Sequence, residues 1–291
     1  MKYGIHNKTG QPTEEECFHI LDAAMEHGID TIDTARAYGT AEVVVGNYLS
    51  YRRINNRINI ISKLRPNIIE AGEKNIYSVV RSELEDSLKR LQVSQLEGYL
   101  LHTPEYVYQN QIIDTMFRLK EEKLIYNVGV SIYNIKEGYE AIKRGLDYVQ
   151  LPYSILDQRG DQTGFLKEAK RNGLKVFVRS VFLQGLFVMD LQEIPVWLEK
   201  AKPYLKNLDN IVKSYKKDKI ELLLQFVKEQ KDIDYLVFGV DTKGQLLENI
   251  DKFEKGERLE KELLKKLYEY GEQVDDSIIL PSLWSNGKKA E

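Results

Sequence analysis

The sequence has 291 residues, of which 42% are apolar and 30% are charged. That composition excludes a disordered chain, and no apolar run approaches the ~18 residues that a membrane span needs. Lysine and arginine total 42 against 45 aspartate and glutamate, and the net charge of −3 argues against a nucleic-acid or anionic-membrane partner. The single cysteine, Cys17, excludes an internal disulfide, and an N-terminus without an apolar stretch predicts a cytoplasmic protein.

Short apolar runs alternate with amphipathic patterns from residue 29 onward. Several of the runs are apolar on both faces, as the strands of a covered parallel sheet should be. The predicted strands are residues 29–35, 58–64, 96–103, 125–133, 148–154, 175–182 and 233–240.

Helical patterns fill the gaps between these runs. Thr13 followed by Glu16 is a capping box and predicts a helix over 14–27, which Gly28 ends. Further helices are predicted over 75–91, 219–229 and 257–273, and the stretch 191–217 is a longer crossover with an extra helix. No linker interrupts the alternation, so residues 1–291 are predicted to form a single domain.

Repeated βα units predict either a doubly wound sheet or a closed barrel. No glycine-rich dinucleotide fingerprint follows the first strand, and no Walker A loop is present. Polar residues instead follow most of the strands, at the edge where a TIM barrel carries its active site. They are Asp33, Lys63, His102, Ser131, Gln150, Arg179 and Asp241. We therefore expect an α/β fold of the TIM (β/α)8 type, for which seven of the eight strands are identified.

Four of the polar residues suit proton delivery to a carbonyl group during hydride transfer. Asp33, Lys63 and His102 end three successive strands, and Tyr38 lies in the loop after the first. A free tyrosine has a pKa of ~10, and a lysine ammonium beside a tyrosine favours the phenolate. The aspartate would hold that lysine, and the histidine would orient the substrate oxygen. Each residue alone has an ordinary structural explanation, so the hypothesis depends on the combination.

At this point the sequence resembles the aldo-keto reductase family. The matching segments are GIDTIDTARAYG (28–39), IISKL (60–64), SLKRLQVSQLEGYLLHTP (87–104), VGVS (128–131), VQLPYSILDQR (149–159), VRSVFLQGL (178–186) and VFGVDTKGQLLENI (237–250). The resemblance implies a barrel that uses NAD(P)H to reduce aldehydes and ketones. It assigns Tyr38 as the general acid, supported by Asp33, Lys63 and His102.

The resemblance also implies the cofactor site. Ser131 and Gln150 match positions that bind the nicotinamide carboxamide, the segment from Ser180 to Gly185 matches a loop that approaches the pyrophosphate, and the segment from Gly239 to Asn249 matches the adenosine site. The implied cofactor residues are Ser131, Gln150, Arg179, Ser180, Phe182, Gln184, Gly185, Gly239, Asp241, Lys243, Gln245, Glu248 and Asn249. Without the resemblance, the polar residues among them are equally well explained as the polar lining of a barrel mouth, and the segment ending in Thr242 as a strand end followed by a helix N-cap.

Three departures from the family pattern stand out. Ile132 replaces an asparagine that many members carry, and Arg179 replaces an aromatic residue that stacks on the nicotinamide. Arg179 could instead bind an acidic substrate or a cofactor phosphate. The family pattern also includes a strand before Tyr3 that this sequence lacks, so about ten residues, one strand and its approach, are absent. Either the natural protein starts upstream of residue 1, which we favour, or the chain is truncated.

Lys243 is the sole cation between Gly239 and Asn249, so NADPH is favoured over NADH. The four histidines form no ligand motif, and no metal is expected. Aromatic and polar residues expected in the substrate wall suit a sugar or another polar carbonyl compound: Tyr3, Asn7, Arg36, Tyr133, Tyr153 and Arg159. Two alternatives stay open, a cofactor-binding protein with a regulatory or vestigial role, and an unrelated barrel isomerase or lyase.

Overall fold

The computed structural model describes residues 4–7, 10–54, 58–70 and 72–284. Its strands form one sheet in the order β1-β2-β3-β4-β5-β6-β7, and the pairs from β1 to β5 are parallel. The strands are β1 (Thr31–Asp33), β2 (Asn59–Lys63), β3 (Leu96–Leu101), β4 (Ile125–Ser131), β5 (Tyr148–Pro152), β6 (Lys175–Arg179) and β7 (Tyr235–Leu236). All seven predicted strands are confirmed, each shorter than its apolar run. The prediction that the first barrel strand is missing concerns the segment before Tyr3, which lies outside the described residues.

Helices separate the strands along the chain. They are α1 (Glu14–Glu26), α2 (Ala41–Arg52), α3 (Ile76–Leu91), α4 (Asn110–Glu121), α5 (Ile135–Lys143), α6 (Arg159–Gln162), α7 (Phe165–Arg171), α8 (Lys202–Tyr215), α9 (Lys219–Glu229), α10 (Lys243–Lys255), α11 (Lys261–Tyr270) and α12 (Asp276–Ile279). Short 3-10 turns are η1 (Pro104–Tyr108), η2 (Leu183–Val188), η3 (Val196–Ala201) and η4 (Pro281–Leu283). The predicted helices are confirmed, with α8 as the extra helix of the long crossover and α11 shorter at both ends than predicted.

The predicted start of α1 has the expected chemistry. Thr13 Oγ1 accepts a hydrogen bond from the Glu16 backbone at 3.3 Å, and Glu16 Oε2 accepts one from the Thr13 backbone at 2.7 Å. Two of the backbone N–H groups at the helix start are thereby satisfied. Gly28 follows the C-cap with a φ of +77°, in the left-handed region that favours glycine.

The chain divides into two compact units. The first comprises Thr13–Leu151 and Gly164–Phe177, and the second comprises Pro152–Thr163 and Val178–Glu291 with Lys2–Pro12. A single domain over residues 1–291 therefore stays a prediction.

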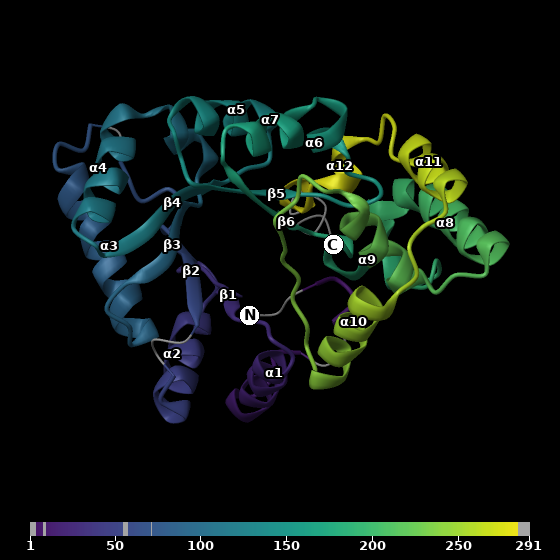
Figure 1. Ribbon diagram of the computed structural model, residues 1–291, viewed down its shortest axis with the longest axis horizontal. Helices are drawn as coiled ribbons and strands as arrows, with labels where there is room; N and C mark the ends of the chain where they lie inside the picture. The colour runs from purple at the N-terminus through teal and green to yellow at the C-terminus, as the bar shows by residue number, and fades with distance from the viewer. Residues whose placement is uncertain (1–3, 8–9, 55–57, 71, 285–291) are drawn as a thin grey trace. The chain divides into compact units, whose positions relative to one another are not determined.

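In the first unit, α2, α3, α4 and α5 lie along one side of β1 to β4 (Figure 1). The apolar stripe of α3 is buried, including Val80, Leu84 and Leu91, which are fully buried. Helix α2 approaches α3 so closely at Gly46 that a Cβ there would lie 2.2 Å from the Arg90 carbonyl oxygen. This packing holds the strands so that their carboxyl ends share one edge, where polar side chains follow β1, β2, β3 and β4.

In the second unit, α9 and α10 pack on each other, and Leu222, Leu224 and Phe226 of α9 are fully buried. Strand β7 is much shorter than the predicted 233–240. It is the last strand in the sheet order of the described residues, and just beyond it the Val237 amide donates to the Val178 carbonyl at 2.7 Å. Beyond it, the chain leads through Gly239 and Asp241 to the Thr242 side chain, which caps α10 by accepting from the Gln245 amide at 3.2 Å.

Candidate active site

The first unit brings Asp33, Lys63, Tyr38 and His102 together. Lys63 ends β2 and is fully buried, and its Nζ donates to Asp33 Oδ2 at 2.6 Å and to the Thr34 carbonyl at 2.9 Å. A buried ammonium needs such partners because its desolvation is otherwise costly. Because β1 and β2 are adjacent and parallel, with Asp33 in register with Ile61, the two side chains reach each other from neighbouring strand ends.

Tyr38 and His102 complete this group. Lys63 Nζ lies 5.2 Å from the centroid of the Tyr38 ring, within the range of a cation–π contact. The rings of Tyr38 and His102 meet edge to face, with centroids 5.9 Å apart and an interplanar angle of 86°. The Tyr38 amide donates to the Ala35 carbonyl at 2.9 Å, which fixes the turn after β1 that carries the phenol.

Gln150 joins the group through a contact that its predicted role did not include. Its Nε2 donates to Asp33 Oδ1 at 2.8 Å, while Lys63 binds the other oxygen of the same carboxylate. Gln150 and Ser131 are both nearly fully buried, at the ends of adjacent parallel strands with Ser131 in register with Gln150. Both residues therefore lie at the same sheet edge, as the order of the strands required. The sequence offered no signal for the Gln150–Asp33 hydrogen bond, which joins residues 117 positions apart.

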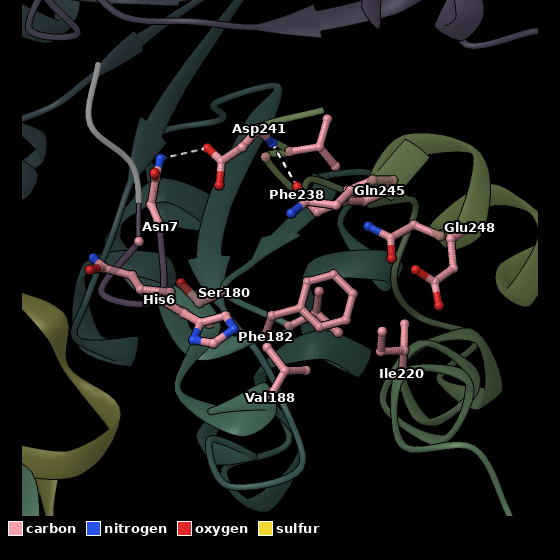
Figure 2. A pocket seen from close by; sticks show the side chains of 17 residues that line it. His6, Asn7, Ser180, Phe182, Val188, Ile220, Phe238, Asp241, Gln245 and Glu248 are labelled. Atoms are coloured by element: carbon pink, nitrogen blue, oxygen red, sulfur yellow. Dashed lines mark hydrogen bonds between the residues drawn. The ribbon is translucent and has the colours of Figure 1, made fainter. Parts of the chain in front are cut away.

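The second unit contains a pocket that opens to solvent, with an empty volume of about 800 Å³ when the open solvent in it is counted. The predicted cofactor residues that line it are Ser180, Phe182, Gln184, Gly185, Gly239, Asp241, Gln245, Glu248 and Asn249. Arg179 and Lys243 are not among its lining residues, and Lys243 is exposed in the first turn of α10. Sequence reasoning missed His6, Val188, Ile220 and Phe238, which also line the pocket and are labelled in Figure 2.

A strained turn forms one wall of this pocket. Ser180, Leu183, Gln184 and Gly185 all have positive φ values, from +46° to +90°. At Gly185 a Cβ would lie 2.8 Å from His6 Cβ, so glycine is required both by the backbone and by the close approach of the N-terminal segment. The Ile5 amide donates to the Gln184 carbonyl at 2.9 Å, which anchors that segment on the turn. Within the turn, the Leu183 amide donates to the Ser180 carbonyl at 2.8 Å and the Gly185 amide to the Phe182 carbonyl at 2.9 Å, so the turn is closed by its own hydrogen bonds.

Asn7 was expected in the substrate wall, and it lines this pocket instead. Its Nδ2 donates to Asp241 Oδ1 at 2.9 Å and to the Gly10 carbonyl at 2.9 Å (Figure 2). Tyr153, also expected in the substrate wall, is fully buried and donates its hydroxyl hydrogen to Asp161 Oδ2 at 2.5 Å. Burial raises the pKa of the Tyr153 hydroxyl, and Asp161 adds to the effect. Tyr153 is therefore a core residue of the second unit. Tyr3 lies outside the described residues.

Comparison with known proteins identifies the family. The sequence profile of the "Aldo/keto reductase family" matches residues 1–271, and the chain belongs to that family. The chain is 25% identical to the aldo-keto reductase YhdN of Bacillus subtilis over 264 residues, which cover 81% of this chain and 78% of that protein.

Solved structures with the same fold include two bacterial aldo-keto reductases. The holo form of the aldo-keto reductase AKR11C1 from Bacillus halodurans superposes with a TM-score of 0.75 at 24% identity, over 91% of both chains. An aldo/keto reductase from Klebsiella pneumoniae, in complex with NADP and acetate, has a TM-score of 0.70 at 22% identity, over 91% of this chain and 89% of that one. The predicted (β/α)8 fold of the aldo-keto reductase type is thereby confirmed, with seven strands in the described residues. Within those residues no helix is long and apolar enough to cross a membrane.

Proposed function

We propose that this protein is an NAD(P)H-dependent oxidoreductase that reduces the carbonyl group of an aldehyde or ketone, with Tyr38 as the general acid. The observation that carries the proposal is the buried Lys63, held by Asp33 and the Thr34 carbonyl and lying 5.2 Å from the Tyr38 ring. A buried lysine beside a tyrosine that is partly exposed suits proton transfer, and a purely structural role does not require this arrangement. Membership of the aldo/keto reductase family supports the same reaction class.

The predicted cofactor residues would bind a nicotinamide dinucleotide. The nicotinamide dinucleotide would supply the hydride, and Ser131 and Gln150 would hold its carboxamide. The Ser180–Gly185 turn would lie against the pyrophosphate, and the pocket lined by Phe182, Gln245 and Asn249 would hold the adenosine half. The complex of the Klebsiella protein with NADP supports a cofactor of this class.

The residues of the first unit would then move one proton. Tyr38 donates its hydroxyl proton to the carbonyl oxygen as that oxygen becomes an alkoxide. Lys63 stabilises the negative charge that Tyr38 gains, and Asp33 holds the lysine in place. His102, with its ring edge to face against Tyr38, would donate a hydrogen bond to the same carbonyl oxygen. We propose a polar substrate of the sugar class, whose hydroxyl groups would suit Arg36 and Tyr133, the residues of the predicted substrate wall that lie in the first unit.

The test compares Tyr38→Phe with the matched control Tyr51→Phe, which removes the hydroxyl of a tyrosine that is 69% exposed on α2. With NADH and NADPH and a panel of aldoses, ketoses and simple aldehydes, the wild type and the control should turn over equally. Tyr38→Phe should lose about 10²- to 10⁴-fold in kcat while its cofactor Kd stays unchanged. Full turnover in Tyr38→Phe would refute the general acid. Cofactor binding by the wild type without turnover of any carbonyl would support the regulatory alternative.

A further inference from the structure

The charges that line the pocket of the second unit are unusual for a site that would hold a phosphate-rich ligand. Among the described lining residues, Asp241 and Glu248 are carboxylates, and no lysine or arginine is present. The lining group that could carry a positive charge is His6. An extra phosphate on the adenosine half would therefore meet negative charge at this end of the site.

Asp241 holds its position firmly. It follows the short β7 and precedes the N-cap of α10, and its backbone amide donates to Gln245 Oε1 at 2.8 Å. Its Oδ1 accepts from Asn7 Nδ2 at 2.9 Å, so one hydrogen bond holds the backbone of Asp241 and another holds its carboxylate (Figure 2). Burial raises the pKa of the Asp241 carboxyl, and the hydrogen bond from Asn7 acts in the opposite direction. No lysine or arginine of the described segments forms an ion pair with it.

Glu248 differs because a lysine compensates its charge. Lys252, one turn further along α10, donates to Glu248 Oε1 at 2.6 Å and lies 2.8 Å from Asp218 Oδ1. One lysine thus serves two carboxylates, and little positive charge is left for a ligand. Lys243, on which the expectation of NADPH rested, is exposed and does not line the pocket. Asp241 is therefore the lining residue that would discriminate most strongly between a hydroxyl and a phosphate.

We propose that Asp241 selects NADH over NADPH. The inference rests on the proposed function, which assigns the adenosine half of a dinucleotide to this pocket. A carboxylate accepts hydrogen bonds from the two hydroxyls of an unmodified adenosine ribose. The 2′-phosphate of NADPH offers no such donor and carries up to two negative charges, which Asp241 repels. Selection by charge inside a partly buried pocket is screened less than at an open surface.

The test is equilibrium binding of NADH and NADPH, measured by cofactor fluorescence and by calorimetry, to the wild type and to Asp241→Asn. Asparagine keeps the shape of the side chain and an oxygen that can accept from Asn7, and it removes the charge. We expect NADH to bind the wild type at least ~10-fold more tightly than NADPH, and Asp241→Asn to reduce that ratio at least ~3-fold, mainly by improving NADPH. Asp251→Asn is the charge control, because Asp251 lies on the same helix outside the pocket lining and should leave the ratio unchanged.

Two further measurements keep the inference separate from the proposed function. In the wild type, the preference for NADH over NADPH should become smaller as the salt concentration rises from 0.05 to 0.5 M. This measurement uses the wild type alone, so it tests the inference even if Asp241→Asn does not fold. 5′-AMP and adenosine 2′,5′-bisphosphate represent the adenosine halves of NADH and NADPH. As competitors of the bound dinucleotide, they should show the same preference, with 5′-AMP binding more tightly. Equal or tighter binding of NADPH by the wild type, or an unchanged ratio in folded Asp241→Asn, would overturn the role of Asp241 and leave the proposed reductase intact. Binding of neither dinucleotide would overturn both.

Discussion

Removing the charge of Lys63 should lower both the free energy of unfolding and kcat, for two different reasons. The structure suggests how to separate these two effects. In Lys63→Met the Asp33 carboxylate, with 11% of its side chain exposed, loses its 2.6 Å ion pair and keeps the hydrogen bond from Gln150. Removing one partner of a buried pair typically costs about 3–5 kcal/mol of unfolding free energy. Methionine fills nearly the same volume, so this loss would reflect the stranded carboxylate and not a cavity.

The effect on turnover follows from the distance between Lys63 and Tyr38. An ammonium 5.2 Å from the ring centroid stabilises a phenolate by roughly 3 kcal/mol at an effective dielectric constant of about 20. That energy corresponds to about a 200-fold change in rate, because each 1.36 kcal/mol is tenfold. We therefore expect Lys63→Met to lose at least about 100-fold in kcat, with little change in cofactor Kd.

The double variant Asp33→Asn/Lys63→Met separates the two effects. It removes both charges, so urea unfolding should return most of the lost stability, while kcat should stay as low as in Lys63→Met. Asp33→Asn alone strands the buried ammonium and should be unstable in its own right. Recovery of turnover in the double variant, or less than a twofold loss in Lys63→Met, would refute the reasoning that Lys63 acts electrostatically on Tyr38.

Three further outcomes are expected. Gly46→Ala should lower the unfolding free energy by at least about 1–3 kcal/mol in a urea titration, because its Cβ would lie 2.2 Å from the backbone of α3. Gly185→Ala should weaken dinucleotide binding in a fluorescence titration, whereas Gly145→Ala, which has a similar positive φ and an open surrounding, should not. Burial acts to raise the pKa of Asp22, but hydrogen bonds from Arg52 and Tyr48 lower it overall, so its contribution to stability is present above about pH 4 and is lost as the pH falls further. Asp22→Asn should therefore cost stability at pH 7 and much less at pH 3 when unfolding is followed by circular dichroism.

Much of the fold was predictable because its signals are local. The capping box at Thr13 and the apolar stripe of α3 depend on residues three or four positions apart, and both are confirmed. Helix α2 gave no such signal. Its buried residues include Glu42, whose Oε1 accepts from the Ser62 hydroxyl at 2.7 Å, and Gly46, which is buried for close approach. A helix that places a glutamate and a glycine inside does not display an amphipathic pattern.

The part of the candidate site that follows from the order of the strands could be predicted from the sequence. Successive parallel strands must end at one edge, so Asp33, Lys63 and His102 could be grouped from their positions. The contacts that complete the site join distant segments and depend on side-chain geometry. Asn7 donates a hydrogen bond to Asp241, 234 positions along the chain, and the sequence around neither residue predicts this contact. The acidic character of the pocket was not predicted either. The sequence suggested Lys243 as a cation near the adenosine site, but in the structure Lys243 does not line the pocket.

The complete burial of Lys63 also has a consequence for chemical labelling. Lysines such as Lys143 and Lys255, with 74% and 78% of their side chains exposed, are open to amine-acylating reagents. Lys63 presents no surface to such a reagent, and its Nζ is already engaged in hydrogen bonds to Asp33 and to the Thr34 carbonyl. It should remain unmodified after the exposed lysines have reacted. Acylation of Lys63, followed by peptide mass spectrometry, would thus report how often the end of β2 opens to solvent.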